Sequence, residues 1–193
     1  PEDDAEVRRV SISNASTRPR EVEITSYAEL VLGSQAADVA HPAFAKMFVR
    51  TEILNAQSAL IAHRRRRSPD EPELWASHNA VIEGTVISGP EYETYRARFI
   101  GRARELRAPL AMLEGSTLSG TAGTVPDPIF ALRYRIRVPA GGTARIAYWT
   151  CVAPSRAAVL EQIDKHRDVN AHTRAATLAW THAQVQLRHF GID

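Results

Sequence analysis

Apolar and polar residues alternate strictly toward the end of the segment Ile129–Val138, and this feature most constrains the fold. Four apolar residues alternate there with three arginines: Leu132, Tyr134, Ile136 and Val138 with Arg133, Arg135 and Arg137. A period of two places successive side chains on opposite faces of a β-strand. The segment is therefore predicted to be a half-buried strand whose arginines face solvent.

Similar patterns recur along the first 152 residues, each bounded by turn-forming residues. Residues 14–19 form such a turn, so the strands on either side of it are predicted to form a β-hairpin. At least eight short strands joined by turns favour an antiparallel β-sandwich. The predicted strands are 6–14, 21–32, 48–54, 59–65, 74–83, 92–99, 129–138 and 143–152.

Two segments between the predicted strands lack this alternation. Residues 33–46 are rich in small residues and contain His41-Pro42, so they are predicted to be a loop. Residues 101–125 hold several glycines and prolines and are predicted to be a long connection, with a short helix near 108–113. Long irregular connections are often functional.

The period changes to that of helices after Val152. Ser155 is suited to cap a helix over residues 156–166, and a second helical run follows over 168–188. An apolar stripe marks this second run: Ala171, Ala175, Leu178, Trp180 and Val185. The sequence therefore predicts a β-sandwich domain over residues 1–153 and a helical linker over residues 154–193. Because the chain begins without Met and ends beside a helical pattern, we expect a longer parent protein.

The charged residues nearly balance, with 24 Lys plus Arg against 22 Asp plus Glu and a net charge of +2. A balanced charge gives little support for a phosphate-binding face, so nucleic-acid binding is the least favoured function. No stretch approaches the roughly 18 apolar residues of a membrane span, and no membrane contact is expected. The single Cys151 cannot form an internal disulfide, and neither a metal site nor a cofactor is expected.

Two polar segments are candidates for binding. His41, Phe44 and Lys46 combine a titratable ring, an aromatic platform and a cation, which suits a sugar-facing or interface loop. The alternative is a structural loop anchored by a buried Phe44. The run Arg64–Arg67 could meet phosphate or an acidic partner. It has no interleaved aromatic residue and is followed by acidic residues, so a solvated strand end is favoured.

Trp75 and four other aromatic side chains could stack on sugar rings. Aromatic residues of a β-sandwich are nevertheless more often packed in its core. The others are Tyr92, Tyr95, Phe99 and Trp149. Glu91 and Glu93 lie two apart on one strand face, where solvation is the simplest explanation. No Ser/His/Asp order or cysteine nucleophile setting is present, so no catalytic residue is expected.

Collinear stretches of the chain resemble the β-sandwich domain of glycoside hydrolase family 94, formerly glycosyltransferase family 36. These are 7–14, 25–29 and 40–52. Three others resemble the cyclic β-1,2-glucan synthase branch of that family: 95–102, the segment from 118–120 to 127–130, and 179–185. Arg102 closes the first of these three, and it joins His41, Phe44, Lys46 and Trp75 as a candidate sugar or interface contact.

The resemblance implies a supersandwich-type β-sandwich followed by a helical linker and an (α/α)6 catalytic barrel. The barrel carries the catalytic and phosphate-binding residues of the family and has no counterpart here, so none is carried over. The implied partners are that barrel, a β-glucan oligosaccharide and a second copy in a homodimer. The implied location is the cytoplasmic side of a bacterial inner membrane, within a membrane-bound parent. A free-standing carbohydrate-binding module and a purely structural dimerisation domain remain alternatives.

Overall fold

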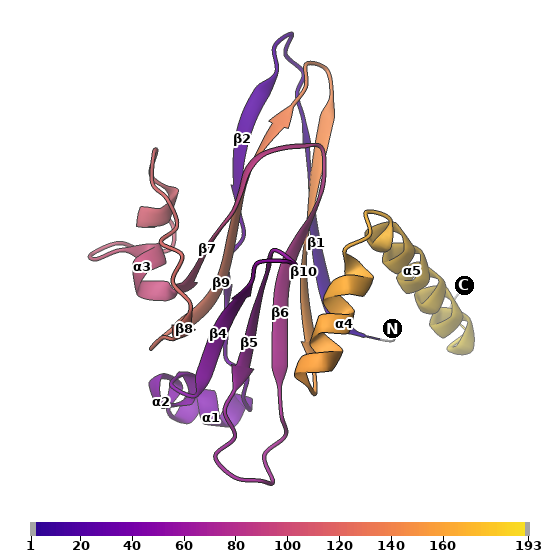
Figure 1. The fold of residues 1–193 in the computed structure, drawn as a ribbon. Helices are drawn as coiled ribbons and strands as arrows, with labels where there is room; N and C mark the ends of the chain where they lie inside the picture. The colour runs from indigo at the N-terminus through magenta and orange to yellow at the C-terminus, as the bar shows by residue number, and fades with distance from the viewer. Residues whose placement is uncertain (1–2, 192–193) are drawn as a thin grey trace.

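Two antiparallel sheets stack face to face in the computed structural model, which describes residues 3–191 (Figure 1). The six-stranded sheet has the order β1-β10-β6-β5-β4-β8. Its strands are β1 (Asp4–Ser13), β10 (Thr143–Ala153), β6 (Trp75–Glu83), β5 (Ala59–Arg64), β4 (Val49–Leu54) and β8 (Gly123–Thr124). The mostly β, antiparallel sandwich predicted from the alternation is confirmed.

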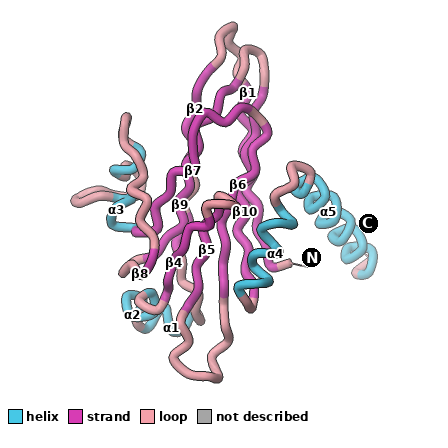
Figure 2. The backbone as a smooth tube through the Cα atoms, viewed as in Figure 1, coloured by secondary structure: helices cyan, strands magenta, loops and turns pink. Residues whose placement is uncertain are grey.

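The second sheet is built around β9 (Pro128–Val138). This strand pairs with β2 (Arg20–Thr25) and β3 (Ala28–Glu29), and also with β7 (Thr85–Tyr95). The six helical segments of residues 3–191 lie outside the two sheets (Figure 2). They are α1 (Gln35–Ala40), α2 (Pro42–Lys46), α3 (Arg96–Ile100), η1 (Leu110–Met112), α4 (Arg156–His166) and α5 (Ala171–His189).

The main core lies between the sheets and contains the apolar residues predicted to alternate along β9. Leu132, Ile136 and Val138 are fully buried there. The prediction that all three arginines of β9 face solvent is wrong for Arg133, which is buried. The long connection after α3 covers this residue, and its guanidinium donates to the carbonyls of Ala111 and Ser116.

The predicted hairpin between the first two strands is wrong, because the strands belong to different sheets. β1 pairs with β10, and β2 pairs with β9. The turn between them crosses from one sheet to the other at a corner that Asn14 holds. The Asn14 amide donates to the carbonyls of Arg18, Val138 and Pro139, and so ties this corner to the β9–β10 corner. Such an interaction has no signature in a local sequence pattern.

Two other segments differ from the predictions. Residues 33–46 contain α1 and α2 rather than only loop, because the Ser34 hydroxyl caps α1 by accepting from the Ala37 N–H. The predicted strand 92–99 ends at Tyr95 and continues as α3. Gly101 ends that helix with φ +85°, a conformation that glycine adopts without strain. The predicted strand 21–32 is likewise divided into β2 and β3.

The helix α4 covers the outer face of the six-stranded sheet. Ser155 accepts from the Ala158 N–H at 3.1 Å, as predicted for an N-cap. Val159 and Ile163 are fully buried against β5, β6 and β10. Among residues 3–191 no helix is long and apolar enough to cross a membrane.

Candidate functional site

Two motifs that are separate in the sequence meet at one end of the sandwich, near α1 and α2 in Figure 1. We call residues 34–48 together with Arg64–Arg67 the helical tip. The Phe44 and Phe48 rings meet edge to face at 5.1 Å, and the Arg67 guanidinium carbon lies 6.0 Å from the Phe44 centroid. The arginine run, which lacks aromatic residues in its own sequence, therefore has two aromatic neighbours in the fold.

The Phe44 side chain is half exposed, at 51%, and Val39 and Met47 are more exposed still. The alternative interpretation of Phe44 as a buried anchor is therefore wrong. His41 lies between α1 and α2 and is exposed. Its backbone N–H donates to the Ala37 carbonyl, which leaves the imidazole outside the backbone capping contact. The exposed side chains of Val39, Phe44 and Met47 thus form an apolar surface beside the Arg67 guanidinium.

Lys46 belongs to a different set of contacts, beside β3 and α3. Its ammonium donates to Asp127 at 2.8 Å, and Arg96 donates to Glu29 at 2.9 Å. The hydrogen bond from Tyr27, followed by that from Arg96, holds the pKa of Glu29 below its usual value. Burial, with Glu29 close by, raises the pKa of Tyr27 to about 12. Lys46 is thus part of an ion-pair network with Asp127 and Arg96, where the helical tip meets the sandwich.

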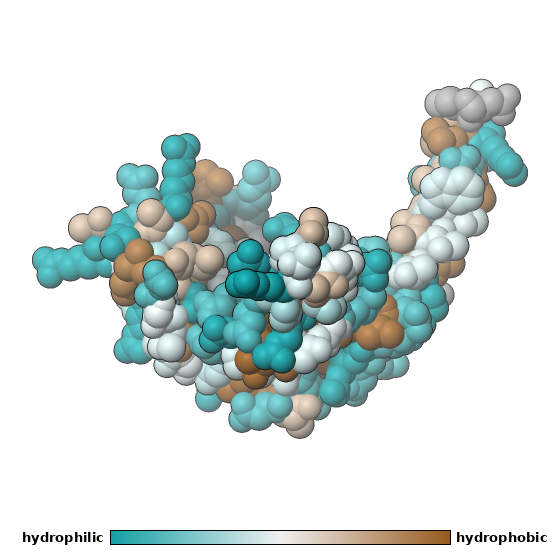
Figure 3. Space-filling view, turned by 90° about the horizontal axis from the view of Figure 1, so that it is seen from above, coloured by the Kyte–Doolittle hydropathy of each residue, from teal (hydrophilic) through white to brown (hydrophobic). Residues whose placement is uncertain are grey.

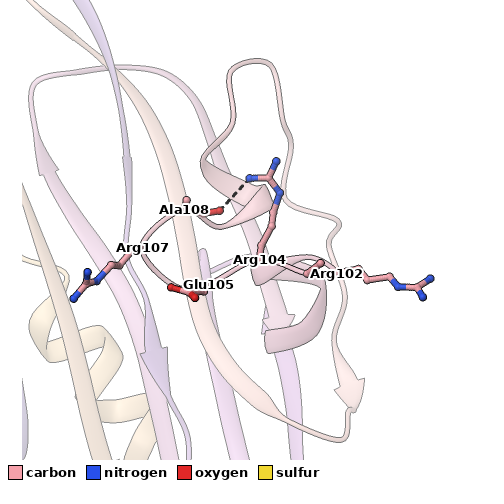
Figure 4. Close-up of a pocket in the computed structure, with 6 residues that line it drawn as sticks. Arg102, Arg104, Glu105, Arg107 and Ala108 are labelled. Carbon is pink, nitrogen blue, oxygen red and sulfur yellow. Dashed lines mark hydrogen bonds between the residues drawn. The ribbon is translucent and has the colours of Figure 1, made fainter.

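Arg102 lies in the loop between α3 and η1, which we call the arginine loop (residues 101–108). This loop lines a cavity of about 550 Å³. Arg102, Arg104 and Arg107 point in different directions, and Arg104 donates to the Ala108 carbonyl at 3.1 Å (Figure 4). Arg102 therefore shares its surroundings with two further arginines and not with His41 or Phe44.

Trp75 lies at the start of β6, under α4, and is only 9% exposed. Its indole stacks on His63 with 4.4 Å between ring centroids, and its N–H donates to Glu73. Burial lowers the pKa of His63. This packing leaves little of the indole for a sugar ring. The core interpretation is confirmed for Phe99 and Trp149, which are also buried.

Glu93 and His78 are two buried polar residues for which no binding role was predicted from the sequence. Glu93, interpreted there as solvated, accepts from the N–H groups of Thr94 and Tyr95 and from the Ser119 hydroxyl. His78 lies between the sheets, and the Phe130 and Tyr148 rings are nearly parallel to its imidazole, each with 5.7 Å between centroids. Burial lowers the pKa of His78 to about 4, so the ring is neutral at pH 7. Both side chains serve the fold.

The last helix, α5, extends away from the sandwich as an arm (Figures 1 and 3). Its first residue, Ala171, is buried. The Nδ1 atom of His172 lies 3.2 Å from the Nη1 atom of Arg9. Beyond this anchor the apolar side chains are uncovered, with Leu178 68% and Trp180 67% exposed. The predicted apolar stripe is therefore covered at its start and open along the rest of the helix.

The relationship to known proteins follows from two comparisons. Residues 1–169 match the family model described as the glycosyl hydrolase 94 supersandwich domain. The chain belongs to this family. It is also 42% identical, over 191 residues, to the cyclic beta-(1,2)-glucan synthase NdvB of Rhizobium meliloti strain 1021. That match covers 99% of this chain and 7% of the synthase.

The family match includes one of the two C-terminal helices and not the other. It ends at residue 169, so α4 lies inside it and α5 lies beyond it. The similarity to the synthase nevertheless continues through nearly the whole chain. The sequence of the arm is thus part of the similarity to that large protein, although it lies beyond the family match.

Proposed function

We propose that this chain is a non-catalytic module of a cyclic β-1,2-glucan synthase. In this proposal its sandwich packs against a catalytic (α/α)6 barrel through α4 and α5, and one of its loops helps to shape the glucan cleft. The similarity to the synthase across 99% of the chain supports that assignment. The single observation that carries the packing proposal is the uncovered apolar surface of α5.

The energetics of an exposed apolar arm favour a partner. A helix of 19 residues gains little stability in water from its own hydrogen bonds, and most helical stability comes from tertiary packing. Only the start of α5 packs on the sandwich, through Ala171 and the partly covered Ala175. Covering Leu178 and Val185 would remove apolar surface from water at about 25 cal/mol per Å².

The buried ionisable groups already have structural roles, which supports the non-catalytic part of the proposal. The Glu93 carboxylate is occupied by two backbone donors and a hydroxyl. The His78 ring nitrogens lie 2.8 Å from the Ser26 hydroxyl and 2.9 Å from the Thr150 hydroxyl. A general acid or base must instead reach a proton on the substrate.

Charged substitutions on the arm test the packing proposal in the full-length synthase. We expect Leu178→Asp with Val185→Asp to reduce the yield of cyclic glucan or change its ring size, because the arm can no longer bury these positions. The matched control is Thr177→Asp with Gln186→Asp, which places the same two charges at exposed polar positions of α5. Unchanged glucan products from the double variant would contradict the proposal.

Titration of the isolated chain with β-1,2-glucan separates this proposal from a free-standing carbohydrate-binding module. Weak or undetectable binding is expected, because a cleft shared between domains is incomplete in one of them. Binding with a micromolar Kd would favour the free-standing module.

A dimerisation domain is the second alternative, and the exposed apolar side chains of the helical tip favour it. If it holds, light scattering should give a dimer for the wild type and a monomer for Phe44→Ala. A wild-type monomer would remove this alternative.

A further inference from the structure

The arginine loop (residues 101–108) and an apolar groove next to it form one surface that combines arginines with exposed apolar side chains. Three arginines and one glutamate give residues 101–108 a net charge of +2, equal to that of the whole chain. Elsewhere arginines are commonly paired, as Arg9 and Arg145 are with Glu83. Within residues 3–191, no carboxylate lies within ion-pair distance of Arg102, Arg104 or Arg107.

The apolar half of this surface is a groove of about 500 Å³ that shares Arg107 and Ala108 with the arginine loop. Tyr27 and Phe99 form part of its wall, with their ring centroids 4.9 Å apart. Three exposed aliphatic side chains also line it: Leu106, Met112 and Leu113. Methionine, aromatic residues and arginine are enriched in protein interfaces.

The backbone fixes this surface instead of leaving it free to rearrange. Phe99 and Ile100 before the loop and Ala111 after it are buried in one cluster with Ile129 of β9. The Ala108 N–H donates to the Glu105 carbonyl at 3.0 Å, which closes the turn. A surface held in place before binding loses less conformational entropy when a partner arrives.

The directions of the arginines decide which partner suits the surface. Figure 4 shows Arg102 and Arg107 pointing to opposite sides of the loop and Arg104 pointing away from both. A single small anion would need guanidinium groups that converge on it. Diverging guanidinium groups beside an aliphatic groove instead suit several carboxylates spread around an apolar centre.

We propose that the arginine loop and its groove dock an acidic protein segment whose carboxylates flank apolar side chains. Resting here on the proposed function, we take the segment from the remaining length of the same large polypeptide, since this chain spans 7% of its relative. A tethered segment is present at a high effective concentration, so contacts of modest strength suffice. This proposal stands apart from the arm, because it uses a different face of the domain.

Photo-crosslinking in the full-length protein tests the proposal. A benzoylphenylalanine replaces Leu106 in one sample and Val86, an exposed aliphatic residue of β7, in the control. We expect Leu106 to crosslink to a segment of the same polypeptide rich in Asp and Glu, as read by mass spectrometry. Crosslinks to lipid, to glucan or to a second copy, or the same products from both positions, would overturn it.

Charge substitutions then test the role of the arginines. Reversal to glutamate at positions 102, 104 and 107 should lower the Leu106 crosslink yield about tenfold, because each attractive pair becomes repulsive. Replacement of the same three arginines by glutamine should lower the yield less. An unchanged yield in both variants would contradict the charge requirement. Unchanged melting temperatures of the isolated variants would show that the loss is not unfolding.

Discussion

The indole of Trp149 on β10 stacks on the imidazole of His166 at the end of α4, with 4.1 Å between ring centroids and 10° between ring planes. Asp3 completes the contact, because its carboxylate lies 3.2 Å from His166 Nε2. The stack fixes the last turn of α4 to the sheet, and α5 begins five residues later at Ala171. It therefore helps to set the direction in which the arm leaves the sandwich.

Removal of the imidazole should loosen this junction. We expect His166→Ala to lower the free energy of unfolding by about 1–2 kcal/mol, because it removes a buried ring contact. Urea unfolding of the isolated chain measures the change. His182→Ala is the control, since that histidine is exposed on α5 and should change stability by less than about 0.5 kcal/mol. Equal effects from the two substitutions would show that the stack does not hold the junction.

The buried imidazole of His78 should make the chain less stable in acid. Its pKa is about 4 in the folded state and near the ordinary histidine value of 6.5 in the unfolded chain. The unfolded state therefore binds the proton first, so stability is present above pH 6.5 and is lost progressively as the pH falls toward 4. Between pH 7 and pH 5 this residue alone should cost about 2 kcal/mol.

Unfolding free energies at pH 7 and pH 5 test this expectation. His78→Gln should unfold with a smaller difference between the two pH values than the wild type shows. His41→Gln is the matched control for loss of an imidazole at an exposed position. Burial also lowers the pKa values of His63 and His166, so some acid sensitivity should persist in the His78 variant. An unaltered pH dependence in His78→Gln would contradict the assignment.

Local sequence patterns predicted the elements of this fold better than their partners. The alternation along β9 and the cap at Ser155 are local features, so the strand and α4 could be placed from the sequence. Sheet pairing depends on contacts between distant residues. The sequence alone therefore could not show that Asn14 joins two corners or that β1 and β2 lie in different sheets.

The same distinction holds for the candidate site residues. The sequence directed attention to Phe44 and to the run Arg64–Arg67, but only the fold brings them together. Trp75 carries no local mark of burial, because the helix that covers it follows about 80 residues later. The arginines at 104 and 107 were visible in the sequence, but only the fold shows that no carboxylate of residues 3–191 pairs with them.

Gly101 should tolerate a methyl group less well than another glycine with a similar positive φ. Its φ is +85°, and a Cβ there would lie 2.7 Å from the Cβ of Leu110. Gly115 has φ +75° and open space around the same position. Both alanine variants carry backbone strain of about 1 kcal/mol, and Gly101→Ala should cost about 1–3 kcal/mol more. Similar melting temperatures for the two variants would contradict this.

The two C-terminal helices should respond differently to truncation of a large aliphatic side chain. Ile163→Ala should destabilise the isolated chain by about 2–4 kcal/mol, because Ile163 is fully buried between α4 and the sheet. Leu178→Ala should change its stability by less than about 0.5 kcal/mol, because that side chain is exposed. Thermal unfolding of both variants measures the contrast, and a large loss in Leu178→Ala would show that the arm packs on the sandwich.

Hydrogen exchange along α5 tests the central claim most directly, that the arm is a docking element for a neighbouring domain. Amide exchange of residues 176–189 is measured in the isolated chain and in the full-length parent protein, with the largely buried central strand β9 as an internal reference. We expect fast exchange of the arm in the isolated chain and at least about tenfold slower exchange in the parent protein, while β9 stays protected in both. Equally fast exchange of the arm in the two proteins would contradict the account.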